Sequence, residues 1–153
     1  MHFTFLPVND QNIAMASQLH IAKAQVGMVE TVTQCYSEAQ ELTQWRPTVI
    51  CADGAMIGFA MYGLWKNEGE SGRVWLDRFL IDEQYQGLGY AKAVLPLLVN
   101  RIIAEYGCTE IYLSVYSTNA VAIHLYEEFG FSFNGELDIN GEKVMVRAEP
   151  LPL

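Results

Sequence analysis

The amino-acid sequence predicts an α/β (α+β) fold, in which a mixed, mostly antiparallel sheet is flanked by helices within a single domain. Its 153 residues match the usual size of one domain and suffice to bury a core. Strand-like and helix-like segments alternate through the centre of the chain, and hairpin turns are indicated on either side, at Asp53-Gly54 and Asn140-Gly141. No linker, repeat or low-complexity segment interrupts the sequence. We therefore expect residues 1–153 to form one domain.

The N-terminal part predicts a short strand followed by two helices. Residues 3–7 form the strand-like block, and an Asn9-Asp10 pair offers caps for a helix over roughly residues 10 to 25. A second helix is predicted from Met28 to Thr43, where apolar residues form one stripe and glutamates recur on the opposite side. These glutamates are Glu30, Glu38 and Glu41. Their acidic face is either ordinary solvated surface or one wall of a cation-binding cleft.

Three strands are predicted next, separated by a tight turn and a polar loop. The β-branched run from Thr48 to Ala52 and the segment from Ala55 to Trp65 form a hairpin about Asp53-Gly54. Residues 66–72 are a polar loop, and a strand from Arg73 to Ile81 follows it. The three strands thus lead the chain into a glycine-rich segment.

The C-terminal part predicts a helix, a strand, a second helix and a closing hairpin. The first helix extends from Ala91 to about Tyr106 and contains Pro96, which removes one backbone donor and is expected to kink it. A strand from Glu110 to Tyr116 and a helix from about Ala120 to Phe129 follow. The two final strands are predicted at residues 131–137 and 143–148.

The glycine-rich segment from Gln86 to Ala91 has the features of an anion-binding site. Gly87 and Gly89 let the backbone approach a ligand closely, and the free N–H groups of the following helix point into the same space. Dinucleotide and nucleoside triphosphate sites share this arrangement. The lack of a Gly-Lys-Ser/Thr ending argues against a P-loop, and a position past the middle of the chain argues against a dinucleotide fingerprint.

The composition favours some partners over others. A net charge of −9 disfavours nucleic acid and anionic membranes and favours a small cationic partner. No apolar run approaches the roughly 18 residues that span a bilayer, and the first residues lack a signal-peptide pattern, so we expect a cytoplasmic protein. Cys35, Cys51 and Cys108 lack the spacing of a zinc site or a disulfide framework. We therefore expect no metal, and we interpret each cysteine as a buried small hydrophobic residue.

A second motif follows the strand that ends near Tyr116. Asn119, Ala122 and Tyr126 are spaced so that they share one face of the predicted helix. Taken alone, Asn119 is interpreted as a helix cap and Tyr126 as a core residue. The sequence Asn119-x-x-Ala122-x-x-x-Tyr126-x-x-x-Gly130-Phe131 nevertheless follows the glycine-rich segment at a distance of one helix and one strand. Two matching segments in this order are an improbable coincidence.

Together the two motifs resemble the signature segments of the GNAT superfamily of N-acetyltransferases. The first is Gln86-x-x-Gly89-x-Ala91, and in that family its amides hold the pyrophosphate of acetyl-CoA. The resemblance implies a GNAT-type fold, acetyl-CoA as co-substrate and an N-acetyltransferase domain. The implied acetyl-CoA-binding residues are Phe79, Leu80, Ile81, Gln86, Gly87, Leu88, Gly89, Tyr90, Ala91, Lys92, Asn119, Ala122 and Tyr126.

Longer segments resemble the bacterial spermine/spermidine (diamine) N-acetyltransferases of this superfamily. These segments are VETVTQCYSEAQ, WRP, GFAMYG, RVWLDRFLID and YQGLGYAK, and the similarity extends over roughly residues 25 to 147. The implied substrate is a polyamine such as spermidine or spermine. A polycation on an aliphatic chain calls for carboxylates and aromatic walls. The pool is Glu30, Glu38, Glu41, Trp45 and Trp75, of which Glu30 and Glu38 are the implied substrate-binding residues, together with Asp77.

The resemblance also implies catalytic roles. An amine must lose its proton before it attacks, because an alkylammonium with a pKa of about 10.4 has no lone pair. The resembling enzymes place a carboxylate at Asp77, which acts as a base directly, through water, or only as an anchor; the alternative is a structural carboxylate. Strand neighbours point to opposite faces, so we expect Arg78 not to neutralise it. Tyr126 is the implied acid for the departing thiolate, and a backbone N–H near Leu80 or Ile81 is the implied oxyanion donor.

Two alternatives stay open at this point. The acceptor amine can belong to an amino acid, an aminoglycoside or a protein N-terminus, because the acetyl-CoA motifs do not identify it. The chain can also be a CoA-binding regulatory module without turnover, although the presence of both Tyr126 and Asp77 argues against this. A homodimer is possible, since such folds often pair through terminal strands.

Overall fold

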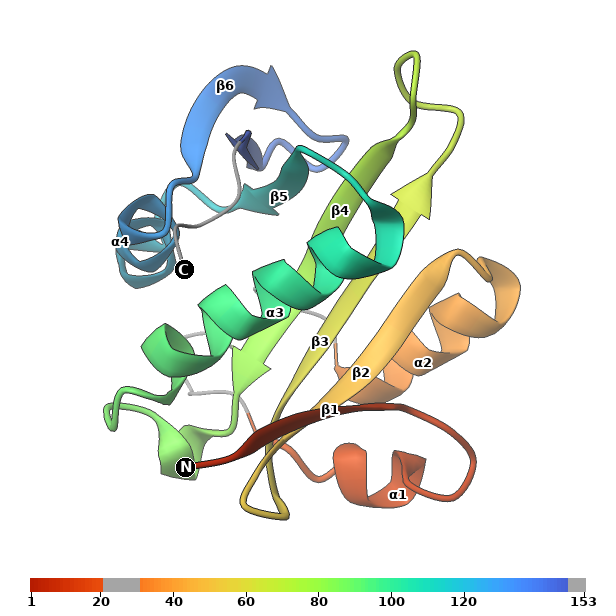
Figure 1. The fold of residues 1–153 in the computed structure, drawn as a ribbon, viewed down its shortest axis with the longest axis vertical. Coiled ribbons are helices and arrows are strands. Elements are labelled where there is room, and N and C mark those ends of the chain that lie inside the picture. Colours follow the sequence, from red (N-terminus) through yellow and green to blue (C-terminus); the bar gives the residue numbers. More distant parts are fainter. Residues whose placement is uncertain (21–30, 149–153) are drawn as a thin grey trace. The chain divides into compact units, whose positions relative to one another are not determined.

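The computed structural model describes residues 1–20 and 31–148 (Figure 1). These residues contain seven strands and four α-helices. The strands are β1 (Phe3–Pro7), β2 (Trp45–Ala52), β3 (Ala55–Trp65), β4 (Arg73–Ile81), β5 (Ile111–Val115), β6 (Ser132–Leu137) and β7 (Lys143–Arg147). The helices are α1 (Ile13–Ala16), α2 (Val32–Glu41), α3 (Tyr90–Tyr106) and α4 (Ala120–Glu128), with a 3₁₀ turn, η2 (Glu83–Tyr85), before α3.

The strands form one sheet in the order β1-β2-β3-β4-β5-β7-β6. Strands β4 and β5 run parallel, whereas the β1–β2, β2–β3, β5–β7 and β6–β7 pairs are antiparallel. A parallel pair needs a crossover, and α3 supplies it between β4 and β5. This arrangement confirms the predicted mixed, mostly antiparallel sheet with helices.

The chain groups into two compact units, each built from two stretches of sequence. The first unit contains residues 1–63 and 77–91, and the second contains residues 64–76 and the chain from Lys92 onward. Elements β3, β4 and α3 each contribute residues to both units. The division therefore does not separate two consecutive domains along the sequence.

In the first unit, the core is built on the β1–β2–β3 meander. Asp53 and Gly54 both have positive φ, 49° and 86°, as a two-residue hairpin turn requires, so the predicted β2–β3 hairpin is confirmed. Helix α2 packs against β2, as Figure 1 shows, and α1 contacts α2. The helix stripe buries Val32, Cys35 and Ala39. The largest fully buried side chains of these strands are Ile50, Ile57, Phe59 and Met61.

In the second unit, β5 lies between the first residues of β4 and strand β7. Val74 pairs with Ile111 on the β4 side, and Ile111 pairs with Arg147 on the β7 side. Strand β6 pairs with β7 and is exposed along its whole length. Helix α4 connects β5 to β6.

The predicted first helix is wrong in length. Residues 10–25 were expected to be helical, but α1 covers only Ile13–Ala16, and residues 17–20 leave the helix in tight turns. Gln18 and Leu19 donate to carbonyls three residues back, and the His20 N–H donates to the Asp82 carboxylate instead of continuing the helix. A long-range contact thus overrides the local periodicity. The remaining predicted residues, 21–25, lie outside the described part.

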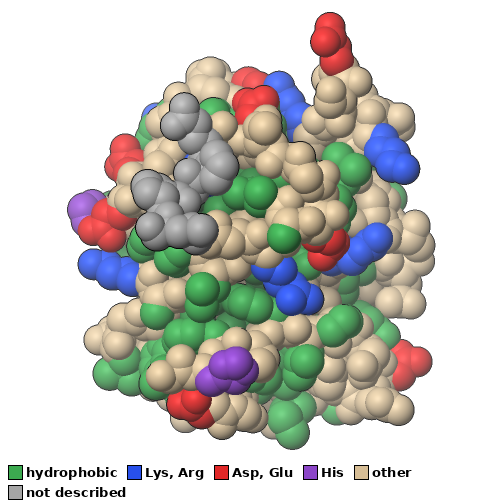
Figure 2. Space-filling model, viewed as in Figure 1, with side chains coloured by type: hydrophobic (Ala, Val, Ile, Leu, Met, Phe, Trp, Pro, Cys, Tyr) green, Lys and Arg blue, Asp and Glu red, His purple; other side chains and the backbone are tan. Residues whose placement is uncertain are grey.

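The surface carries both signs of charge on the face drawn in Figure 2. Acidic and basic side chains are interspersed there, with hydrophobic side chains between them. The net charge of −9 is therefore not gathered into one patch on this face. Within residues 1–20 and 31–148, no helix combines the length and the apolar character needed to cross a membrane.

Candidate active site

The glycine-rich segment forms an exposed turn between η2 and α3. Gly87 and Gly89 have φ of 76° and 83°, a left-handed backbone conformation that residues other than glycine disfavour. A Cβ atom added at either position meets no atom within 4 Å, so the space around the turn is open. Tyr90 and Ala91 then begin a helix of 17 residues, whose first N–H groups have no intrahelical partner. Exposed amides at the start of a long helix fit the diphosphate of a CoA thioester.

Both ends of this turn are held by side chains. The Gln86 side-chain amide Nε2 donates to the carbonyl of Ile81 at 2.8 Å, which ties the turn to the last residue of β4. On the far side, the Tyr90 ring contacts Tyr85 edge-on, with centroids 5.8 Å apart, and Phe3 edge-on, with centroids 6.2 Å apart. Gln86 thus shapes the turn, and its predicted contact with acetyl-CoA stays a prediction.

Strand β4 carries the residues that precede the turn. Phe79 and Leu80 are half-buried, and Ile81 is buried. Gly58 on β3 lies so close to β4 that a Cβ there would collide with the Leu80 carbonyl oxygen. Glycine at this position therefore permits close packing of β3 against the segment predicted to supply the oxyanion donor.

The expected separation of Asp77 from Arg78 is wrong. Arg78 Nη1 donates to the backbone carbonyl of Asp77 at 2.8 Å and lies 3.7 Å from the carboxylate Oδ2. Alternation along a strand fixes the direction of each Cβ atom, but the long arginine side chain curls back to its neighbour. The Asp77 side chain is 28% exposed, so it is neither lost in the core nor fully solvated. Its carboxylate is thus already close to one cation, the Arg78 guanidinium.

Helix α4 places the second motif. The Asn119 side-chain Oδ1 accepts a hydrogen bond from the N–H of Ala122 at 3.3 Å, which confirms its interpretation as the helix cap. Tyr126 is only 8% exposed, and its ring meets Phe131 edge-on, with centroids 5.7 Å apart. Packing of this kind fixes the direction of the tyrosine ring.

The end of α4 is held by a residue that belongs to neither sequence motif. Arg147 on β7 is 4% exposed, and its Nε donates to the carbonyl of Phe129 at 2.9 Å. A cation at a helix C-terminus is favourable because the last carbonyls lack intrahelical donors. The signal available in the sequence was an arginine inside a strand whose other residues are mostly apolar.

A charged group lies at the first turn of α3. Lys92 Nζ is 3.6 Å from Glu128 Oε2, and His124 Nε2 is 3.3 Å from Glu128 Oε1. All three side chains are solvent-accessible, so the pairs are weakly stabilising. The exposure of His124 agrees with the prediction that it lies on the surface.

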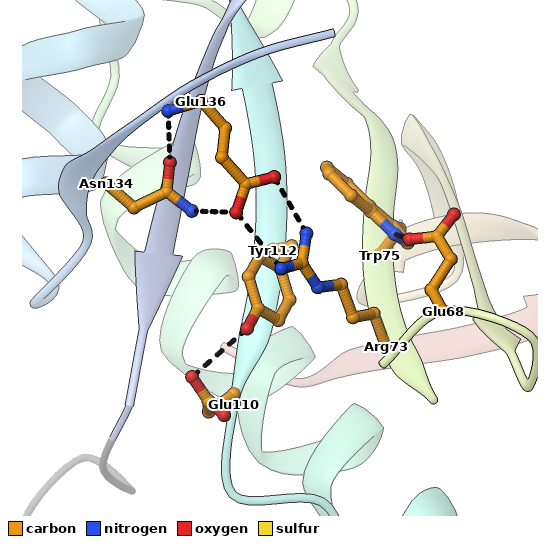
Figure 3. A network of polar contacts seen from close by, with 7 residues as sticks. All are labelled: Glu68, Arg73, Trp75, Glu110, Tyr112, Asn134 and Glu136. Atoms are coloured by element: carbon orange, nitrogen blue, oxygen red, sulfur yellow. Dashed lines mark hydrogen bonds and ion pairs between the residues drawn. The ribbon is translucent and has the colours of Figure 1, made fainter. Parts of the chain in front are cut away.

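A polar and aromatic network surrounds Tyr112 of β5 (Figure 3). Arg73 forms a bidentate ion pair with Glu136, with distances of 2.9 and 3.0 Å, and its guanidinium lies 4.4 Å from the centre of the Tyr112 ring. This hydrogen-bonded contact with Arg73 lowers the pKa of the Glu136 carboxyl. Trp75, a candidate wall for the polyamine, donates its indole N–H to Glu68 at 2.8 Å and contacts the Tyr112 ring.

The acidic face of α2 is only partly described. Glu38 is half-buried and Glu41 is exposed, whereas Glu30 lies outside the described residues. The Tyr36 hydroxyl donates to Asp10 at 2.6 Å, which raises the pKa of that hydroxyl. Trp45 is buried and is thus a core residue.

The cysteines do not have the properties of nucleophiles. Cys35 and Cys51 are buried as predicted, but Cys108 is partly exposed, contrary to the prediction. Cys108 lies shortly before the start of β5, in a segment whose residues are mostly exposed. Burial raises the pKa of the Cys51 and Cys108 thiols, which disfavours the reactive thiolate. Within the described ranges, no three histidine, cysteine or acidic side chains gather as metal ligands do.

Comparisons with known proteins decide the family. The model of the acetyltransferase (GNAT) family matches residues 18–131. The chain belongs to this family. The GNAT chain is also 44% identical over 150 residues to the spermine/spermidine N(1)-acetyltransferase of Bacillus subtilis (strain 168), covering 96% of this chain and 99% of that protein. It is therefore an N-acetyltransferase.

Solved structures show the same fold at lower sequence identity. An aminoglycoside acetyltransferase in complex with coenzyme A matches with a TM-score of 0.79 and 21% identity, covering 96% of this GNAT chain and 95% of that one. The spermidine N-acetyltransferase from Vibrio cholerae in complex with CoA and spermine matches with a TM-score of 0.69 and 21% identity, covering 94% and 92%. Because enzymes with different acceptors share the fold, these structures do not distinguish the acceptor.

Proposed function

We propose that this GNAT enzyme transfers the acetyl group of acetyl-CoA to a primary amine of a polyamine such as spermidine or spermine. The observation that carries the proposal is the 44% identity, over nearly the full length of both chains, to a protein named spermine/spermidine N(1)-acetyltransferase. The open, glycine-rich turn at the start of α3 supports a CoA thioester as the donor, because its amides are accessible to a diphosphate.

Asp77 is the proposed base. It takes a proton from the substrate ammonium, directly or through a water molecule, and frees the nitrogen lone pair for attack. The same carboxylate anchors the substrate by charge. The Arg78 guanidinium lies 3.7 Å from this carboxylate, so a substrate ammonium has to compete with it for the negative charge. Glu38 and Glu30 are the proposed carboxylates for the remaining positive charges of the polyamine.

The remaining steps use one backbone donor and one hydroxyl. The amine nitrogen forms a bond to the thioester carbonyl carbon, and an N–H near Leu80 or Ile81 donates to the oxygen as it becomes negative. The C–S bond then breaks, and the Tyr126 hydroxyl gives its proton to the departing sulfur. The attacking nitrogen releases its second proton to solvent as the amide forms, Asp77 also releases its proton to solvent, and Tyr126 regains one from solvent. The enzyme thus ends the cycle unchanged, with one proton released overall. The Asn119 and Ala122 end of α4 and the Lys92 end of α3 are proposed to contact the CoA arm.

The test is amine-dependent release of CoA from acetyl-CoA across a panel of acceptors. We expect spermidine or spermine to give higher kcat/KM than an aminoglycoside, a free amino acid or a peptide N-terminus. Inactivity with every polyamine alongside activity with another amine would reassign the acceptor within the family. Binding of CoA without release for any amine would identify a non-catalytic module instead.

A further inference from the structure

Asp82 is the one acidic side chain that is buried among the described residues, and it lies just before the glycine-rich turn. It is 4% exposed. Both of its carboxylate oxygens accept backbone hydrogen bonds: Oδ1 from the N–H of Gln84 at 3.0 Å, and Oδ2 from the N–H of His20 at 2.9 Å. A buried carboxylate is costly unless it is hydrogen-bonded, and bonds of this charge-assisted kind are the strong ones. The carboxylate therefore joins two segments far apart in sequence.

The backbone around Asp82 completes the connection. The Asp82 N–H donates to the carbonyl of Ile57 on β3 at 2.7 Å, and the Glu83 N–H donates to the carbonyl of His20 at 2.8 Å. His20 thus donates to Asp82 and accepts from the next residue. Tyr85 then donates to the Asp82 carbonyl at 2.9 Å, which closes η2. The path of the chain into Gln86 and Gly87 is set by this cluster.

A turn with two left-handed glycines needs such support from outside. Glycine has more conformational freedom to lose than any other residue, so the segment has many alternative conformations in which its amides point elsewhere. An anion site binds well only when its donors are already oriented, because a ligand's apparent affinity falls with the fraction of molecules in the competent conformation. The Asp82 carboxylate, which is buried and accepts from two backbone N–H groups, supplies such support.

We propose that Asp82 is a positioning residue for the donor turn, and that its carboxylate keeps the amides of residues 86–91 oriented for the diphosphate of acetyl-CoA. The inference rests on the proposed donor. It assigns Asp82 no contact with substrate or reacting atoms. The effect passes through η2 and the Gln86 side chain to the turn.

Three substitutions separate the two hydrogen bonds that the carboxylate accepts, from Gln84 and from His20. Asp82→Ala removes both acceptors. Asp82→Ser keeps a short acceptor for the Gln84 N–H, as a helix cap does, but does not span the distance to His20. Asp82→Asn retains one oxygen and turns an N–H₂ group toward a backbone N–H. The matched control is Glu83→Gln, which neutralises the exposed adjacent carboxylate.

The measurements are KM for acetyl-CoA, kcat at saturating donor, calorimetric Kd for CoA, and amide hydrogen exchange across residues 83–91 without ligand. If the competent fraction falls to a tenth, KM and Kd rise about 10-fold. We expect this rise of about 10-fold for Asp82→Ala and Asp82→Asn, and a smaller rise for Asp82→Ser. In these variants kcat should be nearly unchanged and amide exchange in the turn should be faster. Glu83→Gln should keep the wild-type values. The ligand-free exchange and the Ser variant decide the question if the Ala variant does not fold.

Two outcomes overturn the inference. One is an unchanged KM and an unchanged exchange rate in the turn, with only a lower melting temperature. The other is a fall in kcat that matches the loss of folded protein, with KM unchanged; either would make Asp82 a structural residue only. Failure of the wild-type enzyme to bind CoA would instead reject the proposed donor, and the exchange experiment would still show whether Asp82 orders the turn.

Discussion

The two buried charged side chains of the described residues, Asp82 and Arg147, solve opposite problems. Each is 4% exposed. Asp82 accepts a hydrogen bond from the backbone N–H of Gln84 at the start of η2, besides the one from His20, whereas Arg147 donates to a backbone carbonyl at the end of α4. The beginning of a helical segment leaves donors unsatisfied and its end leaves acceptors unsatisfied, so an acid suits the first and a base the second. In both units, burial of a charge thus fixes backbone next to a functional motif.

The two motifs differ in what they offer a ligand. The turn at Gly87 and Gly89 is exposed and presents backbone amides, so its chemistry depends on conformation. Helix α4 is packed around Tyr126, and its proposed chemistry depends on one side-chain hydroxyl. Substitutions in the first motif should therefore change the affinity for the donor. Those in the second should change the chemical step.

The largest expected effect tests the second motif, through Tyr126 of α4. Tyr126→Phe keeps the ring and its contact with Phe131 but removes the hydroxyl. Loss of a general acid typically costs about 10² to 10⁴ in rate. We expect kcat to fall in this range while KM for acetyl-CoA stays within about two-fold, because only the transition state loses an interaction. Steady-state kinetics with spermidine measures both, and Tyr116→Phe is the matched control; an unchanged kcat would show that Tyr126 is only a packing residue.

The next effect concerns the support of α4. Arg147→Met keeps the buried aliphatic volume but leaves the Phe129 carbonyl without this donor. A hydrogen bond from a charged group contributes about 1.5 to 3 kcal/mol, and we expect the free energy of unfolding to fall by about that amount. Urea denaturation measures it, with the exposed Lys66→Met as control. Equal stability of the two variants would contradict a structural role for the Arg147 contact.

A smaller effect is expected in the backbone motif. Gly89→Ala adds a Cβ in open space, so no clash results, but an L-residue at φ of 83° is strained by about 1 to 2 kcal/mol. If the turn relaxes to relieve this strain, Kd for CoA should rise about 10-fold with kcat at saturating donor little changed. Calorimetry with CoA measures the change. A variant with wild-type affinity would mean that the amides of this turn do not hold the donor.

The comparison also shows what the sequence was able to predict. The bounds of β3 and β4 follow from local signals: the Asp53-Gly54 turn separates β2 from β3, and the polar residues 66–72 separate β3 from β4. Gln86 and Gly89 belong to a contiguous motif, and Asn119 is a cap that local spacing reveals. Features that act within a few residues are readable from one sequence.

Features that depend on distant partners were missed or misjudged. Asp82 meets His20 62 positions away, and Arg147 meets Phe129 18 positions away, so neither has a local pattern. The same contact of His20 ends the first helix early, against its apolar periodicity. Arg78 was misjudged for a different reason, because strand alternation says nothing about how far a long side chain bends.

The smallest expected effect concerns an exposed carboxylate, in contrast with the buried Asp82. The hydrogen-bonded contact with Arg73 lowers the pKa of Glu136 below its ordinary value of 4.5. A lowered folded-state pKa means that the ion pair stabilises the protein above the unfolded pKa and that this stability is lost as pH falls through the folded value. The Glu136 side chain is 44% exposed, so we expect Glu136→Gln to cost less than about 1 kcal/mol at pH 7.

Thermal unfolding of wild type and Glu136→Gln between pH 7 and pH 3 measures this dependence on pH, with the exposed Glu70→Gln as control. The difference in melting temperature should be largest at neutral pH and should shrink only below about pH 4.5, where the carboxylate of the unfolded chain begins to bind its proton. A difference that grew as pH fell would contradict the assigned direction of the pKa shift. Adding salt should also shrink the difference, because an exposed ion pair is screened while hydrogen bonds to a buried carboxylate are not.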